Sequence, residues 1–347
     1  MPVTLNFFER LGIMELNQGP GPLTDLLGQL ACKAVIAGLN LGIFETLAQT
    51  GAGIDEIAKA SGADTTGLSL LFGALDSLGY LKKRRGKWSV TSMTKKWMLN
   101  ESPHTIAPLF HYFKDVCSRL DYLSESIRTG RPPILGYEWL DNHPDRWEFY
   151  HEGLKSAAHL VSRELFKKVK IPSSARTLFD LGGGHGQYCI EFCKKHTELT
   201  GVIYDWPQAE KIARDNIASS GLSDRIAFRA GDFVKDEIGS DNDVILMFNI
   251  IRIFKPEELS LLFCKAHGAL KKGGMIIVMD HLGNIPRSRF MRANTFLILL
   301  ELYNATIGQT HASDDVKRLL AVNGFSEIRG FHLKRSPGLG VVVAIKR

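Results

Sequence analysis

The chain has 347 residues, 44% of them hydrophobic and 23% charged, which is typical of globular proteins and enough for two domains. No apolar run is long enough to span a bilayer, and no basic segment followed by an apolar core opens the sequence. We therefore expect a cytoplasmic protein that is neither secreted nor inserted in a membrane. The formal net charge of +6 suits an anionic ligand or nucleic acid, but a solvated lysine-rich surface is the simpler explanation.

The first hundred residues predict helices followed by a hairpin. Apolar residues at helical spacing predict a helix from about Leu23 to Ala48, and shorter helices over 54–61 and 64–78. Two short strands then flank a basic turn, Lys82 to Lys87. Three helices before a basic hairpin are typical of a winged helix, and we predict such a domain over residues 1–100.

Residues 101–174 predict a helical connector that contributes to a substrate pocket. The segment begins with a polar, proline-containing stretch and ends near Ile171 and Pro172. It is rich in aromatic residues, among them Phe110, Tyr112, Phe113, Tyr122, Tyr137, Trp139, Trp147, Phe149 and Tyr150.

From Ala175 onward, short apolar runs alternate with helical patterns. The predicted strands cover residues 177–181, 200–204, 226–230, 244–248, 275–279 and 340–346. Alternation of this kind predicts a mostly parallel sheet with helices on both faces. The expected fold class is therefore α/β, with a Rossmann-like domain over residues 175–347 after the N-terminal helical domain.

A glycine-rich turn follows the first of these strands, in the segment Leu178 to Gly186. Its glycines allow the backbone to turn sharply and to approach a ligand closely, and the next helix begins with free N–H groups. The spacing Gly182-x-Gly184-x-Gly186 after Asp180 differs from the dinucleotide pattern G-x-G-x-x-G. It is the form seen in class I methyltransferases.

Two further motifs lie at the ends of the next two predicted strands. Asp205 ends the second strand, where a carboxylate can accept hydrogen bonds from both hydroxyls of a ribose. Asp232 and Phe233 end the third, where they can take the amino group and the ring of an adenine. Ligands of such sheets bind at the carboxyl ends of the strands.

Across essentially its whole length, the chain resembles the two-domain small-molecule methyltransferases of the caffeate and acetylserotonin O-methyltransferase type. The matching motifs are Asp180–Gly184, Asp205–Pro207, Gly231–Phe233 and Lys272–Gly274. The resemblance implies S-adenosyl-L-methionine as cofactor, a small-molecule acceptor and a homodimer. The residues expected to hold the cofactor are Asp180, Gly182, Gly184, Asp205, Asp232, Phe233 and Asn249.

One departure from the family pattern concerns the catalytic base. The family usually has Asn-x-x-His-x-Trp after the fourth strand, whereas this chain has Arg252 in place of the histidine. Arginine stays protonated and cannot act as a general base. The acceptor then needs no strong base, or the base has moved to His281, His311 or His111, or the activity is lost.

Arginine is suited to gripping a carboxylate or phosphate, and Arg289 and Arg292 follow the fifth strand, where the family builds its substrate pocket. A small anionic acceptor is therefore expected. S-methylation of a carboxylate-bearing thioether, such as the methionine-derived hydroxy acid on the route to dimethylsulfoniopropionate, needs no base. O- or C-methylation of an aromatic metabolite is the alternative, and a structural ion pair between Arg252 and Asp280 is a further possibility for the arginine.

Neither a DNA-binding surface nor a metal site is expected. The basic turn could contact DNA, but the preceding helix, 67–78, offers almost no side chains that read bases, so we expect no nucleic-acid partner. Cys189 and Cys193 lie one helical turn apart, but no second cysteine or histidine pair with metal-site spacing accompanies them. The odd cysteine count predicts no disulfide framework. We expect free thiols and no metal site.

Overall fold

The computed structural model describes residues 5–49, 51–283, 285–307, 309–336 and 338–347. By its internal contacts the chain forms two compact units, Met1–His111 and Tyr112–Arg347. The three-part division expected from the sequence, with boundaries at 100 and 174, stays a prediction.

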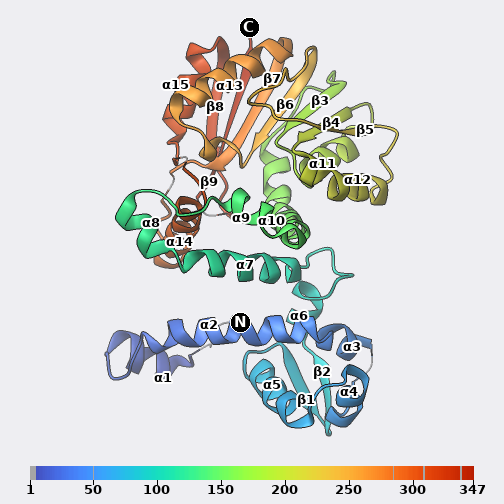
Figure 1. Cartoon of the computed structure of the whole chain (residues 1–347), viewed down its shortest axis with the longest axis vertical. Helices are drawn as coiled ribbons and strands as arrows, with labels where there is room; N and C mark the ends of the chain where they lie inside the picture. The colour runs from blue at the N-terminus through green and yellow to red at the C-terminus, as the bar shows by residue number, and fades with distance from the viewer. Residues whose placement is uncertain (1–4, 50, 284, 308, 337) are drawn as a thin grey trace. The chain divides into compact units, whose positions relative to one another are not determined.

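The first unit contains the expected helices and hairpin (Figure 1). Its elements are α1 (Phe7–Arg10), a π-helical turn (Leu11–Glu15), α2 (Leu23–Asn40), α3 (Ile43–Gln49), α4 (Ile54–Ser61), α5 (Thr65–Ser77), β1 (Leu81–Arg84), β2 (Lys87–Val90) and α6 (Ser92–Trp97). The single helix predicted from Leu23 to Ala48 is wrong, because Gly42 adopts φ +63° and separates α2 from α3. Asp64 caps α5, since its side chain accepts a hydrogen bond from the Gly67 amide at 2.7 Å.

The second unit begins with a layer of helices that precedes the sheet in the chain. These are α7 (Ala107–Leu120, which crosses the boundary between the units), α8 (Leu123–Thr129), α9 (Gly136–Asp141), a 3-10 turn (Pro144–Arg146) and α10 (Trp147–Lys168). A later helix, α14 (Arg289–Ala305), packs against α8 and α9. Arg146 fastens this layer, because its Nε and Nη2 each donate to one oxygen of Asp115 at 2.9 Å.

The sheet of the second unit has seven strands in the order β5-β4-β3-β6-β7-β9-β8. Their bounds are β3 (Thr177–Leu181), β4 (Thr200–Asp205), β5 (Ile226–Ala230), β6 (Asn242–Phe248), β7 (Leu270–His281), β8 (Phe325–His332) and β9 (Leu339–Lys346). The first five strands in this order are parallel, and β9 runs antiparallel between β7 and β8. The expected α/β Rossmann-like fold is confirmed, although β8 was not foreseen.

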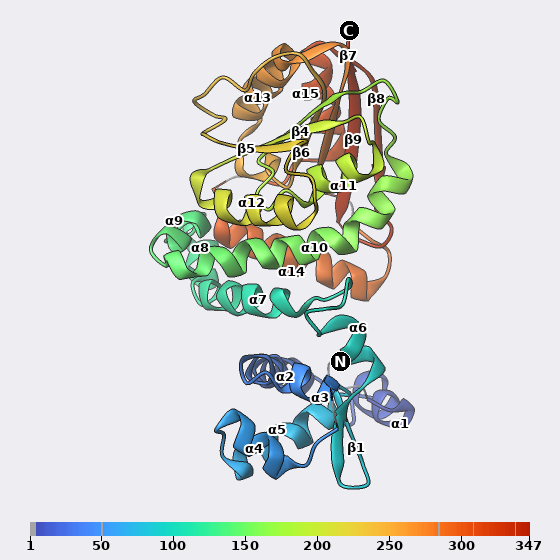
Figure 2. The same cartoon turned by 90° about the vertical axis from the view of Figure 1, so that its right-hand side faces the viewer.

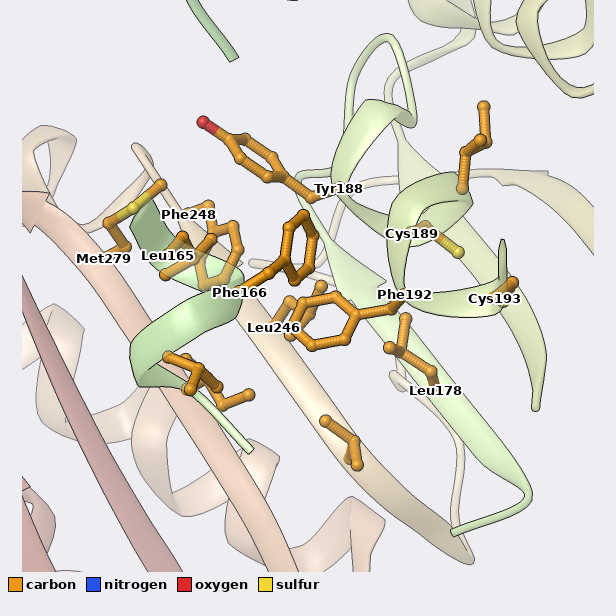
Figure 3. Close-up of a cluster of buried hydrophobic side chains, with 14 of the residues drawn as sticks. Leu165, Phe166, Leu178, Tyr188, Cys189, Phe192, Cys193, Leu246, Phe248 and Met279 are labelled. Carbon is orange, nitrogen blue, oxygen red and sulfur yellow. The ribbon is translucent and has the colours of Figure 1, made fainter. Parts of the chain in front are cut away.

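Helices cover both faces of the sheet (Figures 1 and 2). One face carries α10, α11 (Gln187–Lys195) and α12 (Glu210–Ser219), and the other carries α13 (Pro256–Ala269) and α15 (Ser313–Val322). Figure 3 shows the first of these layers, where Phe166 of α10 meets Phe192 of α11 with ring centroids 4.6 Å apart. Cys189 and Cys193 are free thiols buried in the same layer. Burial on both faces explains why the strands read as continuous apolar runs.

Within the described residues, no single helix has the length and composition to cross a bilayer; α2 and α3, bent by 61°, meet the criterion only when taken together. The same residues contain no group of three or more His, Cys, Asp or Glu side chains placed to hold a metal ion.

Candidate cofactor and acceptor site

The glycine-rich turn follows β3 and leads into α11, at the carboxyl edge of the sheet. Gly182, Gly184 and Gly186 have φ of +70°, +49° and +72°, values that glycine alone adopts without strain. At Gly182 a side chain would also collide with its surroundings, because a Cβ would lie 2.5 Å from Cγ2 of Ile250. The turn therefore depends on glycine for both its conformation and its packing.

Asp205, the last residue of β4, is tied to this turn. Its Oδ2 accepts a hydrogen bond from the Gly184 amide at 2.6 Å, and its Oδ1 accepts one from the Trp206 amide at 2.7 Å. Each oxygen keeps a second lone pair, so the carboxylate can accept from two further hydroxyls. Burial raises the pKa of Asp205 to about 6, against the effect of the two amide donors.

Asp180 lies in β3 and is only 1% exposed. Its Oδ2 has no hydrogen-bond partner among the described residues. Burial and the negative charge of Asp205 raise its pKa to about 7. A Cβ at Gly183 would lie 2.8 Å from the Asp180 Cγ, which explains the second glycine of the turn. Asp180 thus has a buried acceptor oxygen without a hydrogen-bond donor, close to the turn.

Asp232 follows β5, as the sequence predicts. Its Oδ1 accepts from the Val234 amide at 3.0 Å and its Oδ2 pairs with Lys235 at 2.9 Å, with 30% of the side chain exposed. Phe233 is buried against Phe254, with ring centroids 6.1 Å apart. Asp232 is therefore the accessible member of this motif, while Phe233 also belongs to the core.

Asn249 follows β6 with φ +59°, a left-handed conformation. Its amide donates to the Met279 carbonyl at 2.7 Å, and its side chain hydrogen-bonds the Tyr188 hydroxyl. These contacts fix the end of β6 beside β7, at the same edge of the sheet as the glycine turn.

His151, which was not predicted from the sequence, extends from α10 to the glycine turn. Its side chain is 5% exposed, and neither ring nitrogen has a hydrogen-bond partner among the described residues. A Cβ on Gly184 would lie 3.6 Å from both the His151 Nδ1 and the Asp205 Oδ2. Burial lowers the pKa of His151 to about 4, so its imidazole is neutral. A histidine on an otherwise apolar helix face was the only signal in the sequence.

Two aromatic side chains, Trp147 and Tyr150, contact this histidine, and further ring contacts extend from them. Together the five rings form the aromatic cluster: Tyr112, Tyr137, Trp147, Tyr150 and Trp206. The Trp147 ring stacks on His151 at 5.7 Å between centroids. Tyr137 meets Trp206, the neighbour of Asp205, at 4.9 Å, and the Tyr150 hydroxyl lies 3.4 Å from that of Tyr137. The cluster was recognised in the sequence only as an aromatic-rich segment.

Arg252 lies in the 3-10 turn Ile251–Ile253 after β6, close enough to Tyr137 and Tyr150 for them to influence its pKa. Its Nη1 donates to the Asp280 Oδ1 at 2.9 Å and its amide to Oδ2 at 3.3 Å. The two side chains are 18% and 1% exposed. Despite the opposing effect of burial, Asp280, Tyr137 and Tyr150 raise the pKa of Arg252, so it is cationic. The ion pair considered from the sequence is present.

The three histidines considered as alternative bases, His281, His311 and His111, differ from one another in their surroundings. His281 is next to Asp280, and burial together with the charge of Arg252 lowers its pKa to about 4. His311 is 4% exposed, and its Nε2 lies 3.1 and 3.0 Å from the carbonyls of Ile251 and Phe254. Because carbonyls only accept, this nitrogen carries the proton. His111 belongs to the first unit.

Arg289 and Arg292, expected near the substrate, are exposed at the start of α14. A different pair was missed: the Arg119 Nη2 lies 3.4 Å from the Glu301 Oε1, with side chains 6% and 13% exposed. Burial raises the pKa of Glu301, whereas Arg119, Arg252 and Tyr112 act to lower it. No sequence pattern indicates that Arg119 on α7 and Glu301 on α14, which are 182 positions apart, are in contact.

The residues at the edge of the sheet fit S-adenosyl-L-methionine. The Asp205 carboxylate matches a ribose diol, and His151 and Asp180 hold buried polar atoms without protein partners. A buried polar atom without a partner carries a cost that a polar ligand removes.

Comparison with known proteins agrees with this fit. Residues 122–326 match the O-methyltransferase domain family. The chain is 26% identical over 336 residues to a 3-hydroxy-5-methyl-1-naphthoate 3-O-methyltransferase of Streptomyces sahachiroi, covering 94% of this chain and 95% of the relative. It is 25% identical over 272 residues to an L-tyrosine C(3)-methyltransferase of Streptomyces lavendulae, covering 75% and 74%.

Among solved structures, human N-acetylserotonin methyltransferase in complex with S-adenosylmethionine superposes with a TM-score of 0.80 at 21% identity, covering 100% of this chain and 99% of that one. That likeness supports the fold, including the N-terminal helical domain. The family match covers more than half of the chain. This protein therefore belongs to the O-methyltransferase domain family and is an S-adenosylmethionine-dependent methyltransferase acting on a small molecule.

Proposed function

We propose that the acceptor is a small aromatic metabolite and that the methyl group is transferred to its oxygen or to a ring carbon. The observation that carries this proposal is the aromatic cluster, which connects Asp205, through Trp206 and Tyr137, to the neighbourhood of Arg252. Aromatic side chains pack a flat ring with large contact area and defined geometry. The cluster thus suits an aromatic acceptor between the cofactor residues and the arginine.

For the cofactor, we propose that Asp205 accepts hydrogen bonds from the ribose and that Asp232 accepts one from the adenine amino group. Gly182 and Gly184 admit the cofactor close to the backbone, and His151 supplies one further polar contact. Bound S-adenosylmethionine supplies an electrophilic methyl group on a sulfonium centre. The protein's task is then to hold the acceptor atom in line with that methyl group.

For Arg252, we propose electrostatic activation in place of a general base, at the position where the family usually has histidine. A fixed cation favours the ionised form of a nearby hydroxyl and lowers its pKa. A phenol bound beside Arg252 then loses its proton to solvent on binding. The resulting phenolate is nucleophilic at oxygen and at the adjacent ring carbon, which accommodates both O- and C-methylation.

The thioether acceptor expected from the sequence receives less support than this alternative. It rested partly on Arg289 and Arg292 as further carboxylate-binding groups, whereas both are exposed at the start of α14. The curated relatives quoted above act, by their names, on a hydroxynaphthoate and on tyrosine. Both of those acceptors are phenols that carry a carboxylate.

A screen with methyl-labelled S-adenosylmethionine tests the proposal. The acceptors are phenols, hydroxynaphthoates, hydroxyindoles and 4-methylthio-2-hydroxybutyrate, and nuclear magnetic resonance of the products distinguishes O- from C-methylation. We expect label in aromatic acceptors. Transfer confined to the thioether would overturn the aromatic proposal and restore the sulfur acceptor.

The role of Arg252 has a separate test, which compares phenols of different acidity. Arg252→Met should lower kcat strongly for a weakly acidic phenol and little for a nitrophenol, which ionises without help. Arg252→Lys should retain part of the activity because it keeps the charge. An equal loss for all phenols would contradict electrostatic activation and indicate a structural role.

We also propose that the protein is a homodimer formed through its N-terminal helices. The first unit leaves large apolar side chains exposed: Phe7 at 72%, Phe8 at 80%, Leu26 at 61% and Leu30 at 66%. A contiguous exposed apolar surface marks an interface in most proteins, and a second copy of the chain is the partner that the family resemblance implies. Light scattering should give twice the chain mass. Leu26→Asn with Leu30→Asn should produce monomers, and monomeric wild type would exclude the dimer.

A further inference from the structure

The Arg119–Glu301 pair is incomplete, although it is nearly buried. Only one nitrogen of Arg119 contacts the carboxylate, at 3.4 Å, which is long for a charge-assisted hydrogen bond. Its Nη1 is shielded from solvent and has no hydrogen-bond partner among the described residues. The guanidinium lies over the Trp139 ring, 5.3 Å from its centroid. One strong donor of a buried cation is therefore unused.

The same layer of helices contains a complete pair for comparison. Arg146 donates from two nitrogens to both oxygens of Asp115, each at 2.9 Å. That bidentate geometry is what a purely structural ion pair adopts. Arg119 is 5% exposed and still lacks it. Since leaving a buried charged donor unpaired is costly, the incomplete pair indicates a place for a ligand group.

The pair is also close to the proposed acceptor position. Tyr112, a member of the aromatic cluster, and Arg252 both lower the pKa of Glu301, so both are close to its carboxylate. Burial raises the pKa of Glu301, against the effects of Arg119 and Arg252, so the carboxylate lacks the surroundings that would fully stabilise its charge. A ligand cation would supply that stabilisation.

The four charged side chains near the proposed acceptor position have no net charge. Arg119 and Arg252 are positive, whereas Asp280 and Glu301 are negative. A carboxylate bound at Arg119 without a nearby cation would face the negative charge of Glu301 in a largely buried place, which is unfavourable. A zwitterion adds no net charge and offers a carboxylate to the unused donor of Arg119 and an ammonium to Glu301.

We infer that the acceptor is an aromatic α-amino acid whose carboxylate binds Arg119 and whose ammonium group binds Glu301. This inference rests on the aromatic acceptor proposed above and deepens it. Arg119 and Glu301 then determine specificity by holding the amino-acid end, while the hydroxylated ring lies against the aromatic cluster near Arg252.

The test uses two matched ladders of ligands with full-length protein. The first is L-tyrosine, tyramine, 3-(4-hydroxyphenyl)propionate and p-cresol, and the second is the corresponding 5-hydroxytryptophan series. Calorimetry in the presence of S-adenosylhomocysteine gives Kd, and labelled cofactor gives kcat/KM. We expect one complete amino acid to bind about tenfold or more tightly than each analogue that lacks one charged group.

Variants test which residue binds the ligand carboxylate and which binds its ammonium group. Arg119→Met should abolish the preference for the amino acid over the amine and keep its preference over the acid. Glu301→Gln should do the reverse. Asp115→Asn, which alters the structural pair, should lower Tm without changing either preference. Equal losses across the whole ladder in Arg119→Met and Glu301→Gln would overturn the assignment.

The ladders also distinguish a failure of this inference from a failure of the proposed aromatic acceptor on which it rests. Methylation of p-cresol or 5-hydroxyindole without any preference for the amino acid would reject the inference and leave the aromatic acceptor standing. Failure of every aromatic ligand in both ladders, together with label in the thioether, would reject the aromatic acceptor itself.

Discussion

The Gly184 amide donates a 2.6 Å hydrogen bond to the Asp205 carboxylate, joining the glycine turn after β3 to the end of β4. The proposed ribose acceptor and the loop that admits the cofactor are therefore held in one arrangement. A pre-organised site loses less conformational freedom when it binds its ligand. Disturbing either residue should accordingly affect the other.

The first prediction concerns pH. Burial raises the pKa of Asp205 to about 6, and only the ionised carboxylate accepts from both ribose hydroxyls. The affinity for S-adenosylhomocysteine should fall as pH decreases through about 6, and at pH 5 it should be about tenfold lower than at pH 8. Calorimetry across this range measures the effect. Asp205→Asn should bind weakly with a much flatter profile, and an unchanged slope would exclude Asp205 as the titrating group.

The stability of the free protein should change in the opposite sense. Because folding raises the pKa of Asp205 from 3.8, the folded state binds the extra proton. The contribution of this group to the free energy of unfolding therefore falls as pH rises from about 4 to about 6, and then stays constant. Asp180, whose pKa is raised to about 7, contributes in the same direction.

His151→Phe should weaken cofactor binding about tenfold, which corresponds to the loss of one hydrogen bond. The aromatic packing against Trp147 is retained by phenylalanine, so Tm of the free protein should change little or rise, since two buried unpartnered nitrogens are removed. Calorimetry and thermal unfolding provide the two readouts. Wild-type cofactor affinity in this variant would show that His151 does not contact the cofactor.

Gly182→Ala should destabilise the fold as well as the site. The residue would have to adopt φ +70°, which costs about 1–2 kcal/mol. Its Cβ would also displace Ile250, and such overpacking costs about 1–3 kcal/mol. Urea unfolding should show the combined loss. Gly221→Ala, at a positive φ with open space around it, should show only the conformational part.

Arg252 and Asp280 should behave as a coupled pair. Removing either partner leaves a largely buried charge uncompensated, which costs about 3–5 kcal/mol. Arg252→Met combined with Asp280→Asn should lose clearly less stability than the sum of the two single variants. A double-mutant cycle by urea unfolding measures the coupling, and strict additivity would contradict it. The two variants that lack Arg252 should lose methyl transfer to weakly acidic phenols.

The fold was predictable where periodic patterns and turn residues were strong. Apolar runs such as Val244–Phe248 and the glycine turn after β3 predicted the parallel strands and the edge where ligands bind. The break between α2 and α3 was missed because a glycine within a helical pattern is locally compatible with continuing the helix. β8 was missed because it is an edge strand in which only Phe325 is fully buried, and its mixture of polar residues weakens the pattern.

The candidate site was predictable on its cofactor side and not on its acceptor side. Asp205 and Asp232 stand in motifs whose position in the sequence fixes their position in the sheet. Arg119, Glu301 and His151 come from helices that only the tertiary structure brings together. A charged residue in an amphipathic helix resembles any surface residue until the packing of that helix is known.

The backbone that carries Arg252 is fastened by other residues. His311 binds the carbonyls on either side of it, at Ile251 and Phe254, and Asp280 accepts the Arg252 amide. The position of this turn therefore does not depend on which side chain stands at 252. A single codon change there can replace one acceptor chemistry by another while Asp205 and Asp232, at the ends of β4 and β5, keep their places. Enzymes of this kind can then diversify their substrates without first rebuilding the scaffold.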